Sequence, residues 1–292
     1  MLLHKRITEN SLCRYGTQGF FINNTIFHFG GVNEGVEFGN VTKPGVVDRL
    51  ESVDIKNFAT TRFDSPLNGY PPGLYYHGTV PDPEGHLFTI IGGLMHDGND
   101  MAQPKKLRDM QSFAYARPSD SMYLMANLRE GSAMPEQRWG HTLVYNSEGQ
   151  IVLFGGCDLN NKAINSNIWI FDHATTSWIQ KPTKGDAPSP RCMHSVVVID
   201  DYMVVLFGKN ADNSYVNDPV VALNMQTMEW SKELRLGAVP STSSSASIDY
   251  GATNGAEALG AGATGGSSGL GGGAIAGIVI GATKAATPNT HL

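Results

Sequence analysis

The sequence predicts an all-β chain built from tandem units, and three observations support this prediction. One pattern of residues occurs twice at a separation of 53 positions, as His141 and His194 show. Each copy holds two apolar runs of strand length with a polar turn between them, which is typical of a β-hairpin. Glycine follows the second run, and a tryptophan comes near the end of the unit. Self-similarity at a period of about 50 residues is typical of a β-propeller, in which each repeat forms one blade.

The two clearest copies share their opening and their later residues. They open with RWGHT at 138–142 and RCMHS at 191–195, and Gly155 and Gly208 each follow the histidine by 14 positions. Trp178 and Trp230 come late in the two copies. The arginine and histidine opening, the double glycine and the late tryptophan together resemble the kelch motif. This resemblance implies a kelch-type propeller, and we expect such a module to bind another protein rather than to catalyse a reaction.

Two earlier copies are degraded but can still be recognised. Arg14 aligns with Arg138, a hairpin is expected around residues 23–24, and Thr17 stands where the later copies have histidine. The second copy is centred on the strand pattern at 76–91. Residues 1–11 are expected to be an N-terminal strand or the remnant of a preceding blade. Because the first blades carry longer loops, the predicted blade limits are uneven. We expect the blades at about 12–65, 66–130, 131–184 and 185–235.

About four blades form an unusually small propeller, since most kelch relatives have more. We therefore predict an incomplete ring, with a compact four-bladed ring as the alternative. In an incomplete ring the first and last blades each leave one face uncovered. Exposed apolar blade faces and strand edges favour self-association. The sequence thus predicts self-association of the chain through its open blade edges.

Residues that recur at the repeat period are expected to be structural. The histidines should hydrogen-bond between strands, the arginines should brace blades or loops, and the tryptophans should seal one blade against the next. Glycines after the second strand permit a positive φ or a close backbone approach. The set is Arg14, Gly30, Gly31, His77, Gly92, Gly93, Arg138, His141, Gly155, Gly156, Trp178, Arg191, His194, Gly208 and Trp230.

Polar residues in the loops after the glycines break the repeat and are the candidate binding residues. In repeat proteins such loops usually map to one face, and binding residues are often found on loops. Plain solvated loops remain the alternative for each of them. The candidates are His96, Asp97, Asp100, Asp158, Asn160, Asn161, Asp212 and Asn213.

No catalytic, cofactor or metal motif stands out in the sequence, so we expect neither an enzyme nor a cofactor. The alternative is a fragment of a secreted or surface-anchored carbohydrate-active protein, because galactose oxidase uses a related propeller. A net charge of −6 provides no basic field for nucleic acid. Cys13, Cys157 and Cys192 match no metal spacing and no disulfide framework, and we expect Cys157 and Cys192 to be small core residues.

The C-terminal region differs in composition from the predicted propeller. Residues 236–269 are rich in Ser, Gly and Ala and are expected to be a disordered linker. Residues 270–292 begin with 13 mainly apolar residues, fewer than the roughly 20 that a membrane span needs. This ending resembles a truncated form of the stalk and anchor of fungal kelch proteins.

Two expectations about location follow. With no signal peptide and an incomplete span, the chain as written is expected in the cytoplasm, and only a full-length relative would reach a membrane. The alternative is the cell surface or a secretory membrane, if the chain is a truncated gene product. Asn23 and Asn40 would then be glycosylation acceptors.

Overall fold

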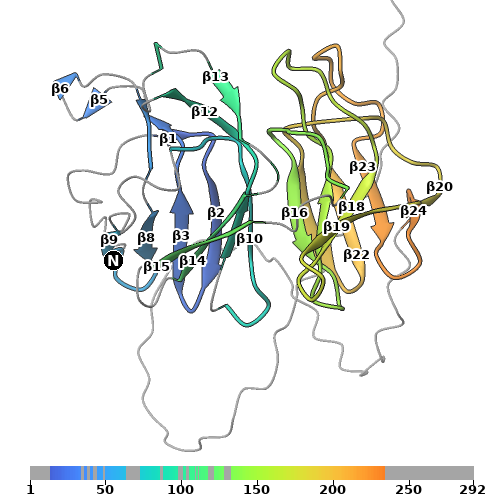
Figure 1. Ribbon diagram of the computed structural model, residues 1–292, viewed down its shortest axis with the longest axis horizontal. Helices are drawn as coiled ribbons and strands as arrows, with labels where there is room; N and C mark the ends of the chain where they lie inside the picture. The colour runs from blue at the N-terminus through green and yellow to red at the C-terminus, as the bar shows by residue number, and fades with distance from the viewer. Residues whose placement is uncertain are drawn as a thin grey trace, which may run out of the picture. The chain divides into compact units, whose positions relative to one another are not determined.

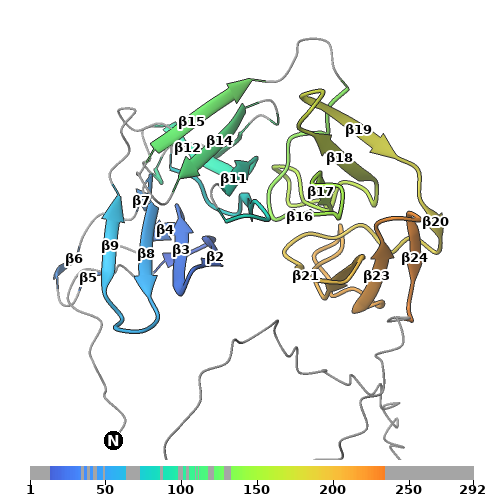
Figure 2. The same cartoon turned by 90° about the horizontal axis from the view of Figure 1, so that it is seen from below.

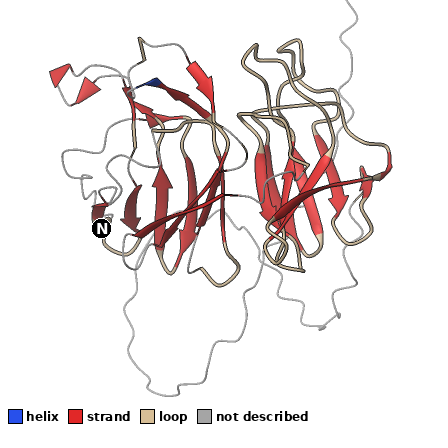
Figure 3. Cartoon of the chain, viewed as in Figure 1, coloured by secondary structure: helices blue, strands red, loops and turns tan. Residues whose placement is uncertain are grey.

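A computed structural model of the chain describes residues within one unit, 1–239. Their regular structure is β-strand, apart from a short helical turn at Asp97 (Figure 3). This confirms the predicted all-β class. The described residues are 14–33, 36–37, 40–41, 45–48, 50–63, 73–85, 88–97, 101–102, 105–108, 110, 112–117, 122–127 and 133–233. The predicted linker, the apolar segment 270–282, Cys13 and Asp100 lie outside them.

Four antiparallel sheets contain most of the strands, and we call them blades 1 to 4 in chain order. Blade 1 contains β2 (Gln18–Ile22), β3 (Thr25–Phe29), β8 (Leu50–Asp54) and β9 (Thr60–Phe63). Blade 2 contains β10 (Gly78–Pro81), β11 (Phe88–Ile91), β14 (Ser112–Arg117) and β15 (Met122–Asn127). Blade 3 contains β16 (Thr142–Tyr145), β17 (Ile151–Phe154), β18 (Ile168–Asp172) and β19 (Ser177–Lys181). Blade 4 contains β21 (Ser195–Ile199), β22 (Tyr202–Leu206), β23 (Val220–Asn224) and β24 (Glu229–Ser231).

The blades follow one another about a common centre, with the first strand of each blade innermost (Figures 1 and 2). β10 contacts both β2 and β16, and β16 also contacts β21. These four inner strands line one cavity of about 1040 Å³. The arrangement is that of a propeller. Among the described residues, no hydrogen bond joins blade 4 back to blade 1.

The apolar strand residues form a core between each pair of neighbouring blades. Alternation along a strand places successive side chains on opposite faces, so each blade can pack against two neighbours. The core between blades 1 and 2 contains Phe20, Phe27, Phe29, Leu50, Leu74, Phe88 and Ile90. The core between blades 2 and 3 contains Val80, Ile91, Met110, Leu143, Ile151, Leu153, Trp169, Phe171 and Trp178. The core between blades 3 and 4 contains Val144, Val152, Phe154, Ile168, Ile170, Met203, Val205, Val221, Leu223, Met225 and Trp230.

Short strands lie outside the four-stranded pattern. β20 (Lys184–Gly185), in the connection between blades 3 and 4, pairs in parallel with β24 and extends blade 4 outward. The others lie in segments that precede or follow the inner hairpins of blades 1 and 2. They are β1 (Arg14–Tyr15), β4 (Val32–Asn33), β7 (Gly45–Val46), β5 (Val36–Glu37), β6 (Asn40–Val41), β12 (Leu94–His96) and β13 (Lys105–Leu107).

The alignment of Gly208 with Gly155 is wrong by one residue. Trp139 pairs with Cys157 in blade 3, 18 positions on, whereas Cys192 pairs with Lys209 in blade 4, 17 positions on. The inner hairpin of blade 4 turns at Asp200 and Asp201 and is therefore one residue shorter. As a result Gly208 occupies the place of Gly156, and Phe207 occupies the place of Gly155.

No helix among the residues that the structure describes is long and apolar enough to cross a membrane. The predicted limits of the blades and of the C-terminal segments stay predictions.

Candidate functional site

The opening segments of the four blades lie at one end of the propeller, as do the loops after the second strands. We call this end the rim. Its mouth consists of one equivalent residue from each blade, and backbone hydrogen bonds join these residues in succession. Tyr76 N donates to Gly16 O (2.6 Å), Gly140 N to Tyr76 O (2.8 Å) and Met193 N to Gly140 O (2.9 Å). These four residues border a small cavity of about 240 Å³. The mouth is thus a continuous backbone arc that presents one side-chain position for each blade.

All four mouth positions have a left-handed backbone. φ is +68° at Gly16 and +65° at Gly140, but also +52° at Tyr76 and +55° at Met193. Glycine adopts this conformation freely, whereas an L-residue pays roughly 1–2 kcal/mol for it. Blades 2 and 4 therefore carry large side chains where the backbone favours glycine.

Aromatic rings surround the mouth, and none of them is among the candidate binding residues predicted from the loops. The ring centroids of Tyr15 and Tyr76 lie 6.4 Å apart, and those of Tyr76 and Trp139 lie 5.2 Å apart. Tyr15 is 41% exposed, Met193 44% and Tyr215, on the loop of blade 4, 81%. Tyr15 precedes the motif Gly16, whereas Tyr76 and Met193 stand in the place of that glycine in their own blades.

The polar loop residues of blades 3 and 4 mainly build their own turns. Asp158 Oδ1 accepts hydrogen bonds from the backbone N–H groups of Asn160 (2.8 Å) and Lys162 (2.9 Å). Asp212 Oδ1 accepts from the N–H (3.0 Å) and hydroxyl (2.6 Å) of Ser214. These bonds lower the pKa of Asp212, with the hydroxyl bond the largest cause. Both carboxylates are therefore already engaged in turn formation.

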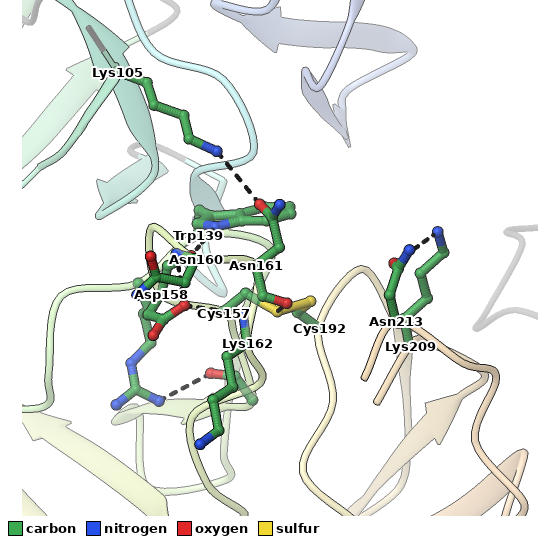
Figure 4. Close-up of a disulfide and its surroundings, with 12 residues drawn as sticks. Lys105, Trp139, Cys157, Asp158, Asn160, Asn161, Lys162, Cys192, Lys209 and Asn213 are labelled. Carbon is green, nitrogen blue, oxygen red and sulfur yellow. Dashed lines mark hydrogen bonds between the residues drawn. A yellow bond between two sulfur atoms is a disulfide. The ribbon is translucent and has the colours of Figure 1, made fainter. Parts of the chain in front are cut away.

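The two turns are equivalent, and each places an asparagine at a left-handed position. φ is +62° at Asn161 and +66° at Asn213, which asparagine tolerates better than most residues. Asn161 Oδ1 accepts a hydrogen bond from Lys105 Nζ (3.4 Å), so it connects the loops of blades 2 and 3 (Figure 4). Asn213 Oδ1 accepts from Lys209 Nζ (3.1 Å) within blade 4.

The two described candidates in the loop of blade 2 differ in exposure. His96 is buried in β12, where its Nε2 forms a hydrogen bond with the Tyr75 hydroxyl (2.9 Å) and its ring stacks on Tyr75. Its side chain is therefore not presented at the surface. Asp97 is exposed and accepts hydrogen bonds from Lys106 Nζ at 2.7 and 2.8 Å. Burial raises the pKa of the Tyr75 hydroxyl to about 12, so it stays protonated.

Cys157 and Cys192 are buried, as expected for core residues, but they form a disulfide bond, which corrects the expectation that the cysteines match no disulfide framework. Their Cα atoms lie 5.5 Å apart although 35 positions separate them in the chain. Cys157 follows β17 in blade 3, and Cys192 belongs to the opening segment of blade 4. The disulfide lies among the rim loops near Trp139 and Asn161 (Figure 4). It covalently joins the two blades at the rim.

The repeated histidines lie between blades. His77 Nε2 donates to the carbonyl oxygen of Phe29 in the preceding blade (3.1 Å), and Thr142 Oγ1 forms a hydrogen bond with His194 Nε2 (2.9 Å). His141 is likewise fully buried. Desolvation lowers the pKa of His77 and of His194 to about 3, and that of His141 well below its usual value. All three imidazoles are therefore neutral at physiological pH.

The repeated arginines hold the opening segments to the strand ends of their own blades. Arg14 Nη1 donates a hydrogen bond to the carbonyl oxygen of Gly30 (3.3 Å), and Arg138 Nη1 donates one to the carbonyl oxygen of Gly155 (2.9 Å). In blade 4 the equivalent bond runs from Arg191 to Phe207 O (3.1 Å), which supports the revised register. Ion pairs with Glu51 (2.5 Å) and Asp218 (2.6 Å) neutralise Arg14 and Arg191 respectively.

The double glycines lie directly against neighbouring segments. A Cβ at Gly155 would be 2.5 Å from His194 Cε1 and 2.6 Å from Arg191 O, and one at Gly92 would be 2.8 Å from His141 Cε1. Both have left-handed backbones. Gly30 makes the corresponding approach to Leu74 O and His77, whereas Gly31, Gly93, Gly156 and Gly208 lie against the opening segment of their own blade.

Trp178 and Trp230 are buried in the cores between blades. Trp178 packs beside Val80 and Met110 of blade 2, and its indole nitrogen donates to Met110 O (3.3 Å). Trp230 packs in the core shared with blade 3, where its ring centroid lies 5.1 Å from that of Phe154. Each tryptophan thus contacts the preceding blade.

Within the described part of the chain, no group of three or more His, Cys, Asp or Glu side chains is placed to hold a metal ion. The repeated histidines lie at blade junctions, which His77 and His194 span with hydrogen bonds.

Four-stranded blades with a motif arginine, a buried histidine and paired glycines at each junction define a kelch-type β-propeller. The chain matches the KLHDC2/KLHL20/DRC7 kelch-repeats domain over residues 16–253 and belongs to the kelch-repeat family. Kelch-repeat domains generally bind other proteins and are generally not enzymes.

Curated relatives contain this region as part of longer chains. Acyl-CoA-binding domain-containing protein 4 of Arabidopsis thaliana is 30% identical over 228 residues, 78% of this chain and 32% of that protein. The host cell factor homolog hcf-1 of Caenorhabditis elegans is 28% identical over 207 residues, 64% of this chain and 24% of that protein. The Rho GTPase-activating protein gacHH of Dictyostelium discoideum is 33% identical over 115 residues, 38% and 8% respectively. The chain thus spans about a third or less of the length of these relatives.

Proposed function

We propose that the chain is a non-catalytic scaffold module that binds another protein at its rim. The left-handed backbone at Tyr76 and Met193 carries this proposal. Two blades keep large side chains at mouth positions where Gly16 and Gly140 adopt the same conformation without strain. Strain of this kind tends to occur at functional sites because binding selects for it.

The chemistry of the rim supports a protein partner. Tyr, Trp and Met are enriched at the centres of protein interfaces, and polar residues are typical of their margins. Here Tyr15, Tyr76 and Met193 surround the mouth, and the turns that contain Asp158 and Asp212 flank it. The aromatic side chains are the anchors in this proposal, and the loop carboxylates mainly shape the turns around them.

Substitution at the two strained positions tests the proposal. Affinity capture with the full chain should recover a partner that a Tyr76→Gly, Met193→Gly variant no longer retains. Glycine relieves the strain but adds unfolded-state entropy, so the Met193→Gly change alone should alter stability by no more than about 1 kcal/mol. Phe58→Ala is a matched control, since Phe58 is 52% exposed in the β8–β9 turn at the opposite end. Equal recovery by the wild type and the rim variant would contradict the proposal.

We also propose that the chain reaches an oxidising compartment, the second of the two expected locations. Support comes from the Cys157–Cys192 disulfide, because such bonds persist mainly outside the cytosol. Asn23 is exposed at the tip of the β2–β3 hairpin, where a glycan could be attached. Protein from its native cells should show the disulfide by mass spectrometry under non-reducing conditions. Two free thiols at these positions would contradict this location.

A further inference from the structure

The three junctions between successive blades share the same backbone chemistry at the rim. The second glycine of one blade donates its N–H to the carbonyl at the arginine position of the next blade. These bonds join Gly31 to Leu74 (2.7 Å), Gly93 to Arg138 (2.9 Å) and Gly156 to Arg191 (2.9 Å). In return, the mouth residue of the next blade donates to that of the preceding blade, as described above. Every internal junction therefore has one donor and one acceptor on each side.

The two outer faces present unused members of the same set. Within the described residues, Gly208 N and Met193 O on blade 4 form no hydrogen bond, and neither does Gly16 N on blade 1. By the pattern of the internal junctions, Gly16 N–H is the donor that matches Met193 C=O. The outer faces of blades 4 and 1 are thus complementary at the mouth.

On the outer faces, the large and the small side chain occupy the opposite positions from those in the internal junctions. Each internal junction places the first glycine of one blade against the histidine of the next, as in Gly155 with His194. Blade 4 has Phe207 in place of that glycine, and blade 1 has Thr17 in place of that histidine. A large residue on one face therefore corresponds to a small residue on the other.

Phe207 also differs from its glycine equivalents because a non-glycine residue is strained in this backbone conformation. Its φ is +58°, and its side chain is 61% exposed. A regular following blade would bring backbone and histidine atoms within 3 Å of its Cβ, as Gly92 and Gly155 show. Phe207 thus excludes a regular blade with histidine. A blade with a small residue at that position would leave room for the ring, with the two backbones slightly farther apart.

Apolar side chains near these positions remain exposed on both outer faces. On blade 4, Val197 is 44% exposed, and on blade 1, Phe21 is 57% and Ile26 is 42% exposed. Val197 lies on the face of β21 opposite to the core with blade 3, because it alternates with Val196. Glu51 on blade 1 is paired with Arg14, so this face does not present an unpaired carboxylate.

We propose that blade 4 of one copy docks against blade 1 of a second copy, with Phe207 seated over Thr17. Phe207 is largely exposed within its own chain, so the matching face comes from another molecule. Each copy has one face of each kind, and two copies can therefore close with two identical junctions. A head-to-tail contact of this kind gives a closed assembly only when the rotation closes. The expected assembly is a dimer, whose two junctions adjoin the mouth at Met193 and Gly16.

Molecular mass measures the association directly. Light scattering on the full chain should give twice the 31.4 kDa of one copy. Phe207→Asp should give monomers, and so should Thr17→His, which fills the space required by the ring. The double variant Phe207→Gly, Thr17→His recreates the internal glycine and histidine pair and should restore the dimer. Tyr215→Asp, 81% exposed on the neighbouring loop, is the control and should remain dimeric.

Circular dichroism of each variant should show the wild-type fold, so that a change in mass reports association alone. A monomeric wild type would overturn the proposal, as would a dimeric Phe207→Asp protein. Failure of the double variant to associate would overturn the assigned contact.

Cross-linking distinguishes contact between copies from closure of one chain. A Thr17→Cys protein mixed with a differently tagged Phe207→Cys protein, both in a Cys13→Ser background, should form a disulfide-linked pair on mild oxidation. Tyr215→Cys in place of Phe207→Cys should form none. A chain carrying both cysteines that cross-links only internally, with unchanged mass, would overturn the proposal in favour of a closed four-bladed ring.

Discussion

Cys157 and Cys192 join blades 3 and 4 across the rim, with their Cα atoms 5.5 Å apart. The bond closes a loop of 35 positions. A cross-link over this separation should stabilise the fold by about 3–4 kcal/mol, mainly by restricting the unfolded chain. The joint rim of the two blades thus depends on a covalent bond as well as on packing.

The first prediction concerns this disulfide. A Cys157→Ser, Cys192→Ser variant should lose about 3–4 kcal/mol of unfolding free energy in urea. Reduction of the wild-type protein should lower its stability similarly, whereas the double variant should not respond to reductant. A wild-type protein whose stability is unchanged by reduction would show that the bond does not form in solution.

The second prediction concerns the tryptophans between blades. Trp178→Ala and Trp230→Ala should each lower the unfolding free energy by about 3–5 kcal/mol, because each leaves a large cavity in a blade core. The two side chains are only 2% and 3% exposed, which supports stability losses of this size. Phe58→Ala, at an exposed turn, is the control and should change stability little. Small losses at both tryptophans would mean that the blades do not rely on these contacts.

The third prediction separates backbone strain from junction packing. Gly155→Ala and Gly149→Ala both place a side chain at a left-handed position, with φ of +67° and +73°. Only the Cβ at residue 155 meets the next blade, since nothing lies within 4 Å of one at residue 149. Gly149→Ala should therefore cost about 1–2 kcal/mol, and Gly155→Ala should cost at least about 1 kcal/mol more. Thermal unfolding of the two variants would check this, and equal losses would contradict the close junction.

The fourth prediction concerns acid. Folding lowers the pKa of His77 and His194 to about 3 from a usual value of 6.5, because burial disfavours the charged form. The unfolded chain therefore binds more protons between these values, so stability is fully present above pH 6.5 and falls as the pH drops toward 3. At pH 5 each such histidine should cost about 2 kcal/mol relative to pH 7.

Urea unfolding at pH 7 and pH 5 measures this loss. His77→Gln should be less stable than the wild type at pH 7 but should lose less on acidification, since one titrating group is gone. Equal losses in the two proteins would show that His77 is not buried in its neutral form.

Local patterns in the sequence were enough to predict the repeats, the strands and their approximate positions. The reason is that a strand and a hairpin turn are determined by residues next to one another. The apolar run of β21 and the glycines after β3, β11 and β17 are read directly from such patterns. The expectation of an incomplete ring rests on the count of about four units, since most kelch relatives have more.

Tertiary structure alone decided the features that depend on distant residues. Cys157 and Cys192 pair because two blades bring them together, and no local spacing indicates it. One residue fewer in the hairpin of blade 4 places Phe207 where glycine was expected, and only strand pairing shows this shift. His96 is buried against Tyr75, and Asp158 and Asp212 accept backbone N–H groups within their own turns, contacts that residue polarity alone does not reveal. The repeat determined which blade each residue belongs to, whereas packing between blades determined which side chains remain available for contact.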